Sequence, residues 1–194
     1  MRRFLSGLGC LLFVGLTACR DRGFVTPPPQ ILGSSLNSMV NDSEPQFSYD
    51  GRYLVFASDR RARQSIFLYD VQRRRLVNLP GLNKPNAMQY QPDISADGRY
   101  IVYISEERGR PEVFVYDRQT FQAEAIDDSP LGQVRQPSIS GNGRFISFEA
   151  NRSGHWDVQI YDRGSNVDLS LPGNQAPQAP EAPTSPQVSP APEN

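Results

Sequence analysis

One stretch of residues occurs three times in this 194-residue chain, and it limits the fold more than any other feature. The copies begin at Pro45, Pro92 and Pro137, and each reads Pro-x-(Phe/Ile)-Ser, then a turn, an arginine and an apolar run. A second landmark, Tyr-Asp, follows in every copy at the same spacing of 47 and then 45 residues. A fixed period of this length indicates that the chain is built from copies of one structural unit.

Each copy predicts four short strands. Proline opens the first strand, because it cannot donate a hydrogen bond within a ladder. The Asp-Gly or Asn-Gly pair predicts a hairpin with a two-residue type I′ turn, in which both residues have positive φ. The next run, such as Tyr53 to Ala57, is apolar on both alternating faces, which is typical of a strand buried on both sides. The third strand ends at Tyr-Asp, and weaker fourth strands are predicted at 75–79, 121–126 and 167–171. We expect structural roles for the turn residues Asp50, Gly51, Asp97, Gly98, Asn142 and Gly143. Asp70, Asp117 and Asp162, which end the third strands, are expected to accept backbone hydrogen bonds in the turns that follow.

Four-stranded units of this length, doubly buried in the middle, are typical of β-propeller blades. We therefore predict an all-β fold with blades at about 41–83, 88–128 and 133–171, inside a folded region 31–171. A β-sandwich with coincidental turns is the alternative, but it does not explain the period. Closed propellers have roughly four to eight blades, so we expect an incomplete propeller with two open end faces that expose apolar runs such as 53–57 and 145–148. Residues 30–37 line up with 74–83 and are expected to form a spare fourth strand.

The repeat Pro-x-(Phe/Ile)-Ser-x-Asp-Gly-Arg-(Tyr/Phe), with Ser-Asp-Arg at 58–60 and later Ile-Phe-x-Tyr-Asp, resembles the repeat of TolB-type β-propellers. The resemblance covers 41–163 and is specific for the fold, not for a function. The third copy departs from it, with Asn142 for aspartate and Gln159 for the aromatic residue. TolB resembles this chain only in part, because it has a further α/β domain and a six-bladed propeller. The resemblance implies an envelope binding protein, without carrying over the particular partners of TolB.

The N-terminus predicts export and lipid attachment. Two arginines precede an apolar run, Phe4 to Leu16, which fits the core of a signal peptide and is too short for a transmembrane helix. The tetrapeptide at 16–19 resembles the lipobox of bacterial lipoproteins, which implies cleavage after a signal peptide at 1–18 and acylation of Cys19. Cys10 would leave with that signal, so the mature chain would hold one cysteine and no disulfide. An ordinary signal peptide cut elsewhere, or a short transmembrane anchor, is the alternative.

Both ends of the mature chain predict little folded structure. Residues 19–30 contain consecutive prolines and are expected to form a tether between the bilayer and the folded region. Residues 172–194 contain seven prolines and no aromatic residue, a composition that cannot bury enough apolar surface to fold. Arg20 follows the cysteine, in place of the aspartate that resembles an inner-membrane retention signal. We therefore expect a periplasm-facing protein, with the outer membrane favoured.

The sequence offers little for catalysis. It has one histidine, His155, so a metal cluster or a Ser-His-Asp triad would depend on that residue alone. It lacks Gly-x-Ser-x-Gly, the serine motif of hydrolases whose propellers resemble these blades. After residues 1–18 are removed, the chain has 18 basic and 21 acidic residues. This charge balance does not favour binding to nucleic acid. We expect no enzyme activity, no catalytic residues, no cofactor, no metal site and no nucleic-acid partner.

Two classes of function remain. The first is a scaffold that contacts envelope proteins, whose identity the sequence does not give, through loops or strand edges. The second is a propeller that binds or cleaves cell-wall glycan, with Trp156 and Tyr90 as stacking platforms. Arginine clusters at 60–63 and 73–75 fit solvated hairpin turns, or else an anion site. The blade count also predicts that a second copy closes a six-bladed ring as a homodimer, or that the open faces dock on another propeller protein.

Overall fold

The computed structural model describes residues 35–126, 132–152 and 154–168. These residues form eleven β-strands and no helix, which confirms the all-β prediction. In the described ranges no helix is long and apolar enough to cross a membrane. The predicted signal peptide (1–18), the lipidation site Cys19, the tether (19–30) and the proline-rich tail (172–194) lie outside these ranges.

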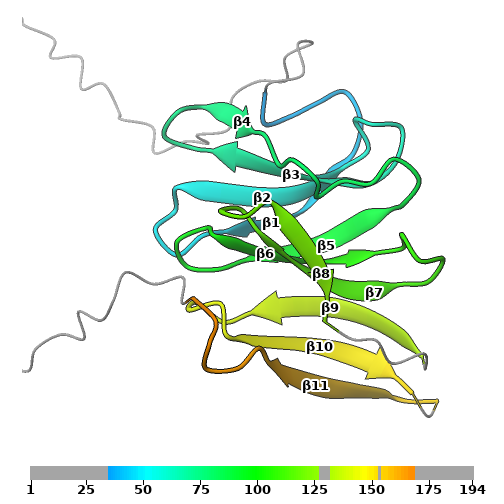
Figure 1. Cartoon of the computed structure of the whole chain (residues 1–194). Coiled ribbons are helices and arrows are strands. Elements are labelled where there is room, and N and C mark those ends of the chain that lie inside the picture. Colours follow the sequence, from blue (N-terminus) through cyan, green and yellow to red (C-terminus); the bar gives the residue numbers. More distant parts are fainter. Residues whose placement is uncertain (1–34, 127–131, 153, 169–194) are drawn as a thin grey trace, which may run out of the picture.

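The strands form three antiparallel sheets in chain order, stacked one after another in Figure 1. The first sheet contains β1 (Asp42–Phe47), β2 (Tyr53–Ser58), β3 (Ser65–Asp70) and β4 (Arg75–Val77). The second contains β5 (Gln89–Ile94), β6 (Tyr100–Ser105), β7 (Glu112–Asp117) and β8 (Gln122–Ala125). The third contains β9 (Gln133–Ile139), β10 (Phe145–Asn151) and β11 (Trp156–Asp162). Each sheet corresponds to one copy of the sequence repeat, and the described residues do not close the stack into a ring.

Apolar side chains of the middle strands form the core between the sheets. Val55 and Ala57 of β2 are fully buried against the second sheet, in a cluster that includes Tyr103 and Phe114. A second cluster joins the second sheet to the third and includes Tyr100, Val102, Ile146 and Phe148. The expectation that the runs 53–57 and 145–148 expose their apolar side chains at open faces is therefore wrong for most of them. Ile146 and Phe148 point into the stack, because the pleat sends alternate residues to opposite faces.

The hairpin after each first strand differs from the predicted two-residue type I′ turn. Gly51, Gly98 and Gly143 have φ angles of 67°, 78° and 77°, but the preceding Asp50, Asp97 and Asn142 do not have positive φ. The Ser48 N–H donates to the Tyr53 carbonyl at 2.9 Å, which leaves residues 49–52 in the loop. The longer loop is held by side chains: the Ser48 hydroxyl donates to Asp50 at 2.6 Å, and the Arg52 N–H donates to the same carboxylate at 3.0 Å.

The third sheet lacks a fourth strand within the described residues. The predicted strand 167–171 is not formed at Val167 and Asp168, and residues 169–171 lie outside the described ranges. Val167 packs instead on the cluster between the second and third sheets, and the Tyr100 hydroxyl donates to the Asp168 carbonyl at 2.7 Å. In this part of the chain β11 is therefore an edge strand. The spare strand expected at 30–37 is likewise not formed at residues 35–37.

Candidate interaction site

The first strands of the three sheets, β1, β5 and β9, lie side by side and share one irregularity. In each, a bulge shifts the pairing with the next strand just before the proline of the repeat. The residue before that proline has positive φ: 56° at Glu44, 51° at Gln91 and 51° at Gln136. A left-handed conformation costs a residue other than glycine about 1–3 kcal/mol, and it persists only where the surroundings hold it. Such strain gathers at functional sites, so this row is a candidate site.

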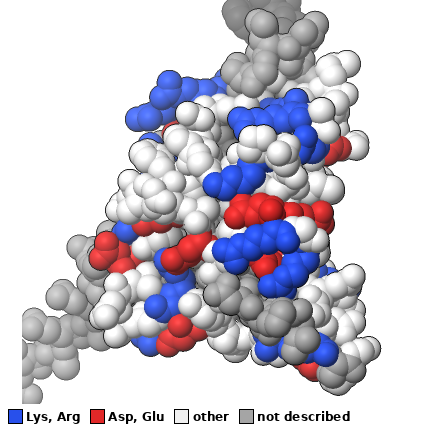
Figure 2. All heavy atoms as spheres, turned by 45° about the vertical axis from the view of Figure 1, so that its right-hand side comes forward, with Lys and Arg blue, Asp and Glu red and all other residues white. Residues whose placement is uncertain are grey.

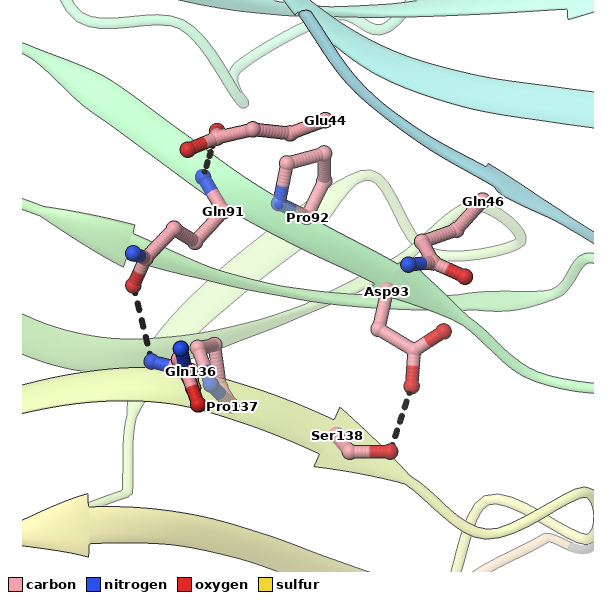
Figure 3. A pocket seen from close by; sticks show the side chains of 8 residues that line it. All are labelled: Glu44, Gln46, Gln91, Pro92, Asp93, Gln136, Pro137 and Ser138. Atoms are coloured by element: carbon pink, nitrogen blue, oxygen red, sulfur yellow. Dashed lines mark hydrogen bonds between the residues drawn. The ribbon is translucent and has the colours of Figure 1, made fainter.

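The three strained residues hold one another in a chain of hydrogen bonds. The Gln91 N–H donates to the Glu44 carboxylate at 2.6 Å, and the Gln136 N–H donates to the Gln91 side-chain oxygen at 2.7 Å. Figure 3 shows the side chains of Glu44 and Gln91, each reaching the backbone of the next sheet. A side-chain oxygen of one sheet thus satisfies the strained backbone of the next.

A parallel contact follows along the same strands. The Asp93 carboxylate of β5 accepts hydrogen bonds from the Ser138 hydroxyl at 2.8 Å and from the Ile139 N–H at 2.9 Å, both in β9 (Figure 3). Gln46 occupies the equivalent position in β1 and is exposed. Together these residues line an open hollow of about 440 Å³, whose walls are Glu44, Gln46, Gln91, Pro92, Asp93, Gln136, Pro137 and Ser138.

The walls of this hollow supply hydrogen-bonding groups and negative charge. Glu44 and Asp93 are carboxylates, three residues are amides, and none of the lining residues is basic. Ser138 contributes the one hydroxyl, which is bonded to Asp93. The arrangement suits the binding of a segment that presents N–H donors. The sequence pattern carried a signal for this site, because all three strained residues precede the repeated proline, but their role became visible only when the sheets were placed side by side.

The aspartates that end the third strands hold the turns that follow, as expected from the sequence. The Asp117 carboxylate accepts from the Gln119 N–H at 2.8 Å and also pairs with Arg99 at 2.9 Å. Burial opposes the charged form of Asp117, but the hydrogen bonds from Arg99 and the Gln119 N–H hold its pKa below the ordinary value. Asp162 pairs with Arg144 at 2.8 Å in the third sheet. The arginine of the repeated Asp-Gly-Arg turn therefore has a structural role that the sequence pattern did not reveal.

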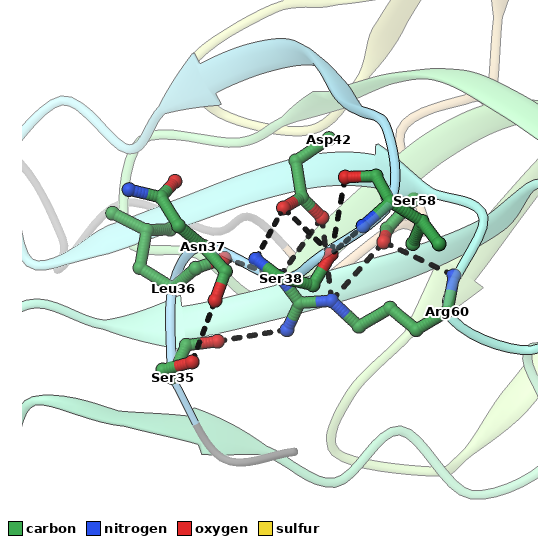
Figure 4. A network of polar contacts seen from close by, with 8 residues as sticks. Ser35, Leu36, Asn37, Ser38, Asp42, Ser58 and Arg60 are labelled. Atoms are coloured by element: carbon green, nitrogen blue, oxygen red, sulfur yellow. Dashed lines mark hydrogen bonds and ion pairs between the residues drawn. The ribbon is translucent and has the colours of Figure 1, made fainter. Parts of the chain in front are cut away.

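Arg60 is not a solvated turn residue. Its side chain is 10% exposed and pairs with Asp42 at 2.8 Å. It also donates to the carbonyls of Ser35, at 2.7 Å, and Leu36 (Figure 4). Its guanidinium carbon lies 5.2 Å from the ring centroid of Phe56. This network fixes the segment before β1 against the first sheet. The face of the first sheet that points away from the second sheet is therefore largely covered.

The carboxylate of Asp42 stays charged inside this network. Burial opposes the charged form, but hydrogen bonds from Ser58, Ser38 and Arg60 outweigh it and hold the pKa of Asp42 below its ordinary value. The anion site expected at the first arginine cluster is therefore occupied at Arg60 by a carboxylate of the protein itself. Figure 2 shows other basic side chains in the upper part of the molecule, where the first sheet lies.

The two aromatic residues considered for glycan stacking lie in different sheets and are both engaged. The guanidinium carbon of Arg135 lies 3.9 Å from the ring centroid of Trp156, whose exposed fraction is 36%. The Tyr90 hydroxyl donates to Glu106 at 3.0 Å. Burial and then that hydrogen bond raise the pKa of Tyr90 to about 12.

His155 is exposed and lies 3.2 Å from Asp157. No cluster of three metal-ligating side chains occurs among the described residues.

Comparison with known proteins assigns the family. The model described as the TolB beta propeller domain matches residues 34–186. The chain belongs to the TolB β-propeller family. The resemblance drawn from the repeat is therefore confirmed, and the three sheets are TolB-type blades.

Solved structures agree on the fold. TolB from Acinetobacter baumannii is similar with a TM-score of 0.53 and 19% identity, over 70% of this chain and 33% of that chain. A putative TolB from Agrobacterium tumefaciens gives a TM-score of 0.54 and 22% identity, over 67% of this chain and 49% of that chain. This chain thus spans a third to a half of the TolB proteins that it matches. An oligogalacturonate lyase from Vibrio parahaemolyticus is more distant, with a TM-score of 0.43 and 16% identity, over 55% of this chain and 28% of that chain.

At these identities the likeness to solved TolB structures shows the fold alone. No curated protein sequence matches the chain. The residues of the hollow, and not the family, must therefore indicate what the blades bind.

Proposed function

We propose that this protein is a non-enzymatic, lipid-anchored scaffold of the cell envelope, which binds a segment of a partner protein in the hollow along β1, β5 and β9. The observation that carries this proposal is the row of left-handed residues Glu44, Gln91 and Gln136. Each blade accepts backbone strain at the same place, and the result is a continuous polar surface across three blades. A surface of this kind suits an extended chain better than a compact metabolite.

The chemistry of the hollow defines the segment that fits. Its carboxylates, Glu44 and Asp93, favour a segment with free N–H donors and cationic side chains. Its prolines, Pro92 and Pro137, give flat apolar surface between the polar groups. The lining has a serine but no histidine or lysine to serve as its base, which supports binding and not hydrolysis.

The location of the protein is proposed from the sequence. Cys19 would carry the lipid anchor after removal of residues 1–18, and residues 19–30 would tether the blades to the bilayer. Because Arg20 follows the cysteine, we place the anchor in the outer membrane with the blades facing the periplasm. Acylation at two positions matters here, since a single acyl chain gives only marginal membrane binding.

Glycan binding is the alternative function, with Trp156 and Tyr90 as platforms. The structure favours it less, because Arg135 lies over the Trp156 ring and the Tyr90 hydroxyl is bonded to Glu106. Retention of the protein on isolated peptidoglycan, abolished by Trp156→Ala, would favour this alternative.

Co-purification with a substitution inside the hollow tests the proposed function. Gln46 is exposed, and no hydrogen bond of its side chain holds the blades together, so Gln46→Arg should fill the hollow and offset part of its negative charge without unfolding the protein. Asn86→Arg adds the same charge at an exposed residue outside the lining and serves as the control. We expect a protein that co-purifies with the wild type and with Asn86→Arg to be lost from Gln46→Arg. An unchanged set of partners in Gln46→Arg would contradict the proposal.

A further inference from the structure

The backbone contacts between neighbouring blades run in one direction. The Tyr49 N–H of the first blade donates to the Ala96 carbonyl of the second at 3.0 Å. The Ala96 N–H then donates to the Gly141 carbonyl of the third at 2.9 Å. The bonds from Gln91 to Glu44 and from Gln136 to Gln91 repeat at the same two interfaces, with the later blade donating to the earlier one. One head-to-tail interface thus occurs twice within the chain.

The two ends of the described blades carry complementary halves of this interface. The third blade ends the series with the Gly141 N–H and the Gln136 side-chain oxygen. The first blade begins it with the Tyr49 carbonyl and the Glu44 N–H. Within the described residues no further blade continues the series at either end. The third blade of one copy therefore presents the groups that the first blade of another copy matches.

Apolar exposure follows the same pattern on the third blade. Val158 and Ile160 of β11 have exposed fractions of 71% and 74%. The residues at the same repeat positions in the first and second blades are almost completely buried against the following blade, with exposed fractions of 0–2%: Ile66, Leu68, Val113 and Val115. The face of the third blade that would meet a following blade is thus uncovered.

On the first blade the corresponding uncovered apolar side chain is Phe47, whose exposed fraction is 59%. Its counterparts Ile94 and Ile139, which face the preceding blade, are exposed by only 5% and 8%. Exposed apolar side chains at positions that are buried in both internal interfaces indicate a missing neighbour.

The segment before β1 covers part of this face but leaves Phe47 exposed. Leu36 packs there on Leu54 and Phe56, and Arg60 pins the segment. The equivalent segment before β5 contains Leu82, which is fully buried in the core between the first and second blades. Such a segment is therefore an ordinary part of a blade interface in this protein, and a preceding blade can pack beside it.

We propose that the third blade of one copy docks on the first blade of a second copy, so that two copies close a six-bladed ring. Head-to-tail interfaces close into rings when the rotation between units allows it, and six blades lie within the range of roughly four to eight found in closed propellers. Ring closure would turn the open hollow into a channel lined by the first strands of both copies. The inference is independent of the proposed partner-binding function, since it rests on the blade interfaces alone.

Disulfide cross-linking in the full-length chain tests this arrangement. A Cβ added at Gly141 would lie 3.4 Å from the Ala96 Cβ, close to the roughly 3.5–4.5 Å that a disulfide requires. Ala96→Cys with Gly141→Cys should therefore link the second and third blades within one chain, which is the positive control. In the proposed ring Gly141 takes the place of Ala96, and Tyr49 of the second copy takes the place of Gly141. Tyr49→Cys with Gly141→Cys should then give a covalent dimer on a non-reducing gel.

Single cysteine variants, and a substitution on the uncovered face of the third blade, test the geometry of the link between the two copies. Cells that produce Tyr49→Cys and Gly141→Cys chains together should form mixed dimers, whereas either variant alone should form none beyond the background set by Cys10 and Cys19. Ile160→Lys, added to the double variant, should abolish the dimer and leave the internal control link intact. Three results would overturn the proposal: no dimer when the control link forms, self-linked dimers of one single variant, or a cross-link to a different protein.

Discussion

The guanidinium carbon of Arg118 lies 4.3 Å from the ring centroid of Tyr53, so an arginine of the second blade covers an aromatic ring of the first. The same guanidinium donates to the Gly98 carbonyl at 2.6 Å, in the turn that meets that ring. Arg163 and Tyr100 repeat the arrangement at 4.2 Å between the third and second blades. These pairs join consecutive blades on the side of the molecule where the Asp-Gly turns of the repeat lie.

Loss of this arginine should therefore loosen the blade interface. We expect Arg118→Ala to lower the free energy of unfolding by about 1–2 kcal/mol, because a partly buried cation–π contact and a charged hydrogen bond are both removed. Lys84→Ala, at an exposed side chain, should change it by less than about 0.5 kcal/mol. Denaturant unfolding of both variants provides the measurement. Equal effects at the two positions would show that the contact does not stabilise the stack.

The glycines of the repeated turn should differ in their tolerance of a side chain. Gly51 and Gly98 both have positive φ, so valine at either position is strained by about 1–3 kcal/mol. A Cβ at Gly98 would also lie 2.5 Å from Cδ2 of Tyr53, whereas nothing lies within 4 Å of a Cβ at Gly51. We expect Gly98→Val to lower the melting temperature clearly more than Gly51→Val. Identical melting curves for the two variants would contradict the packing of Tyr53 on that turn.

Asp162 should titrate far below an ordinary aspartate. Hydrogen bonds from Arg144, and then from the Gly164 N–H, lower its pKa from 3.8 to about 2. Because the pKa is lower in the folded state, any stabilisation from this pair is complete above pH 3.8 and is lost as the pH falls toward 2. In Arg144→Gln the pKa should rise toward 3.8, which carboxyl chemical shifts can follow by NMR. An unchanged titration in that variant would show that Arg144 is not the cause.

The local parts of this fold could be predicted from the sequence, and the contacts between blades could not. Pairing of neighbouring strands depends on short runs such as Tyr53 to Ala57, whose alternation is visible in the chain. The strained backbone at Gln91 donates to the carboxylate of Glu44, a residue in the preceding blade. No local pattern specifies such a bond, so the hollow was not foreseen.

Two sequence expectations failed for identifiable physical reasons. The type I′ turn is wrong because the Ser48 hydroxyl and the Asp50 carboxylate stabilise a longer loop. The open face expected at Phe148 is wrong because the apolar residues of this strand do not by themselves reveal which neighbouring blade each side chain faces. Burial assigns Phe148 to the preceding blade and Ile160 to the uncovered face.

Cys19 should be the only residue that fixes the protein to a membrane. We expect Cys19→Ala to block incorporation of labelled palmitate and to leave the precursor uncut, because the sulfur is the predicted site of acylation. Cys10→Ala, in the same segment, should be labelled and processed like the wild type. Normal processing of Cys19→Ala, together with an unlabelled wild type, would contradict the lipoprotein prediction.

The mass of the purified protein tests the central structural claim most directly. Sedimentation of the full-length protein in detergent, with the bound detergent and lipid subtracted, should give twice the mass of one mature chain. Ile160→Lys, which places a charge on the uncovered face of the third blade, should reduce this to the mass of a single chain. A wild type that sediments as a single chain over a wide concentration series, indistinguishable from Ile160→Lys, would contradict closure of the ring by a second copy.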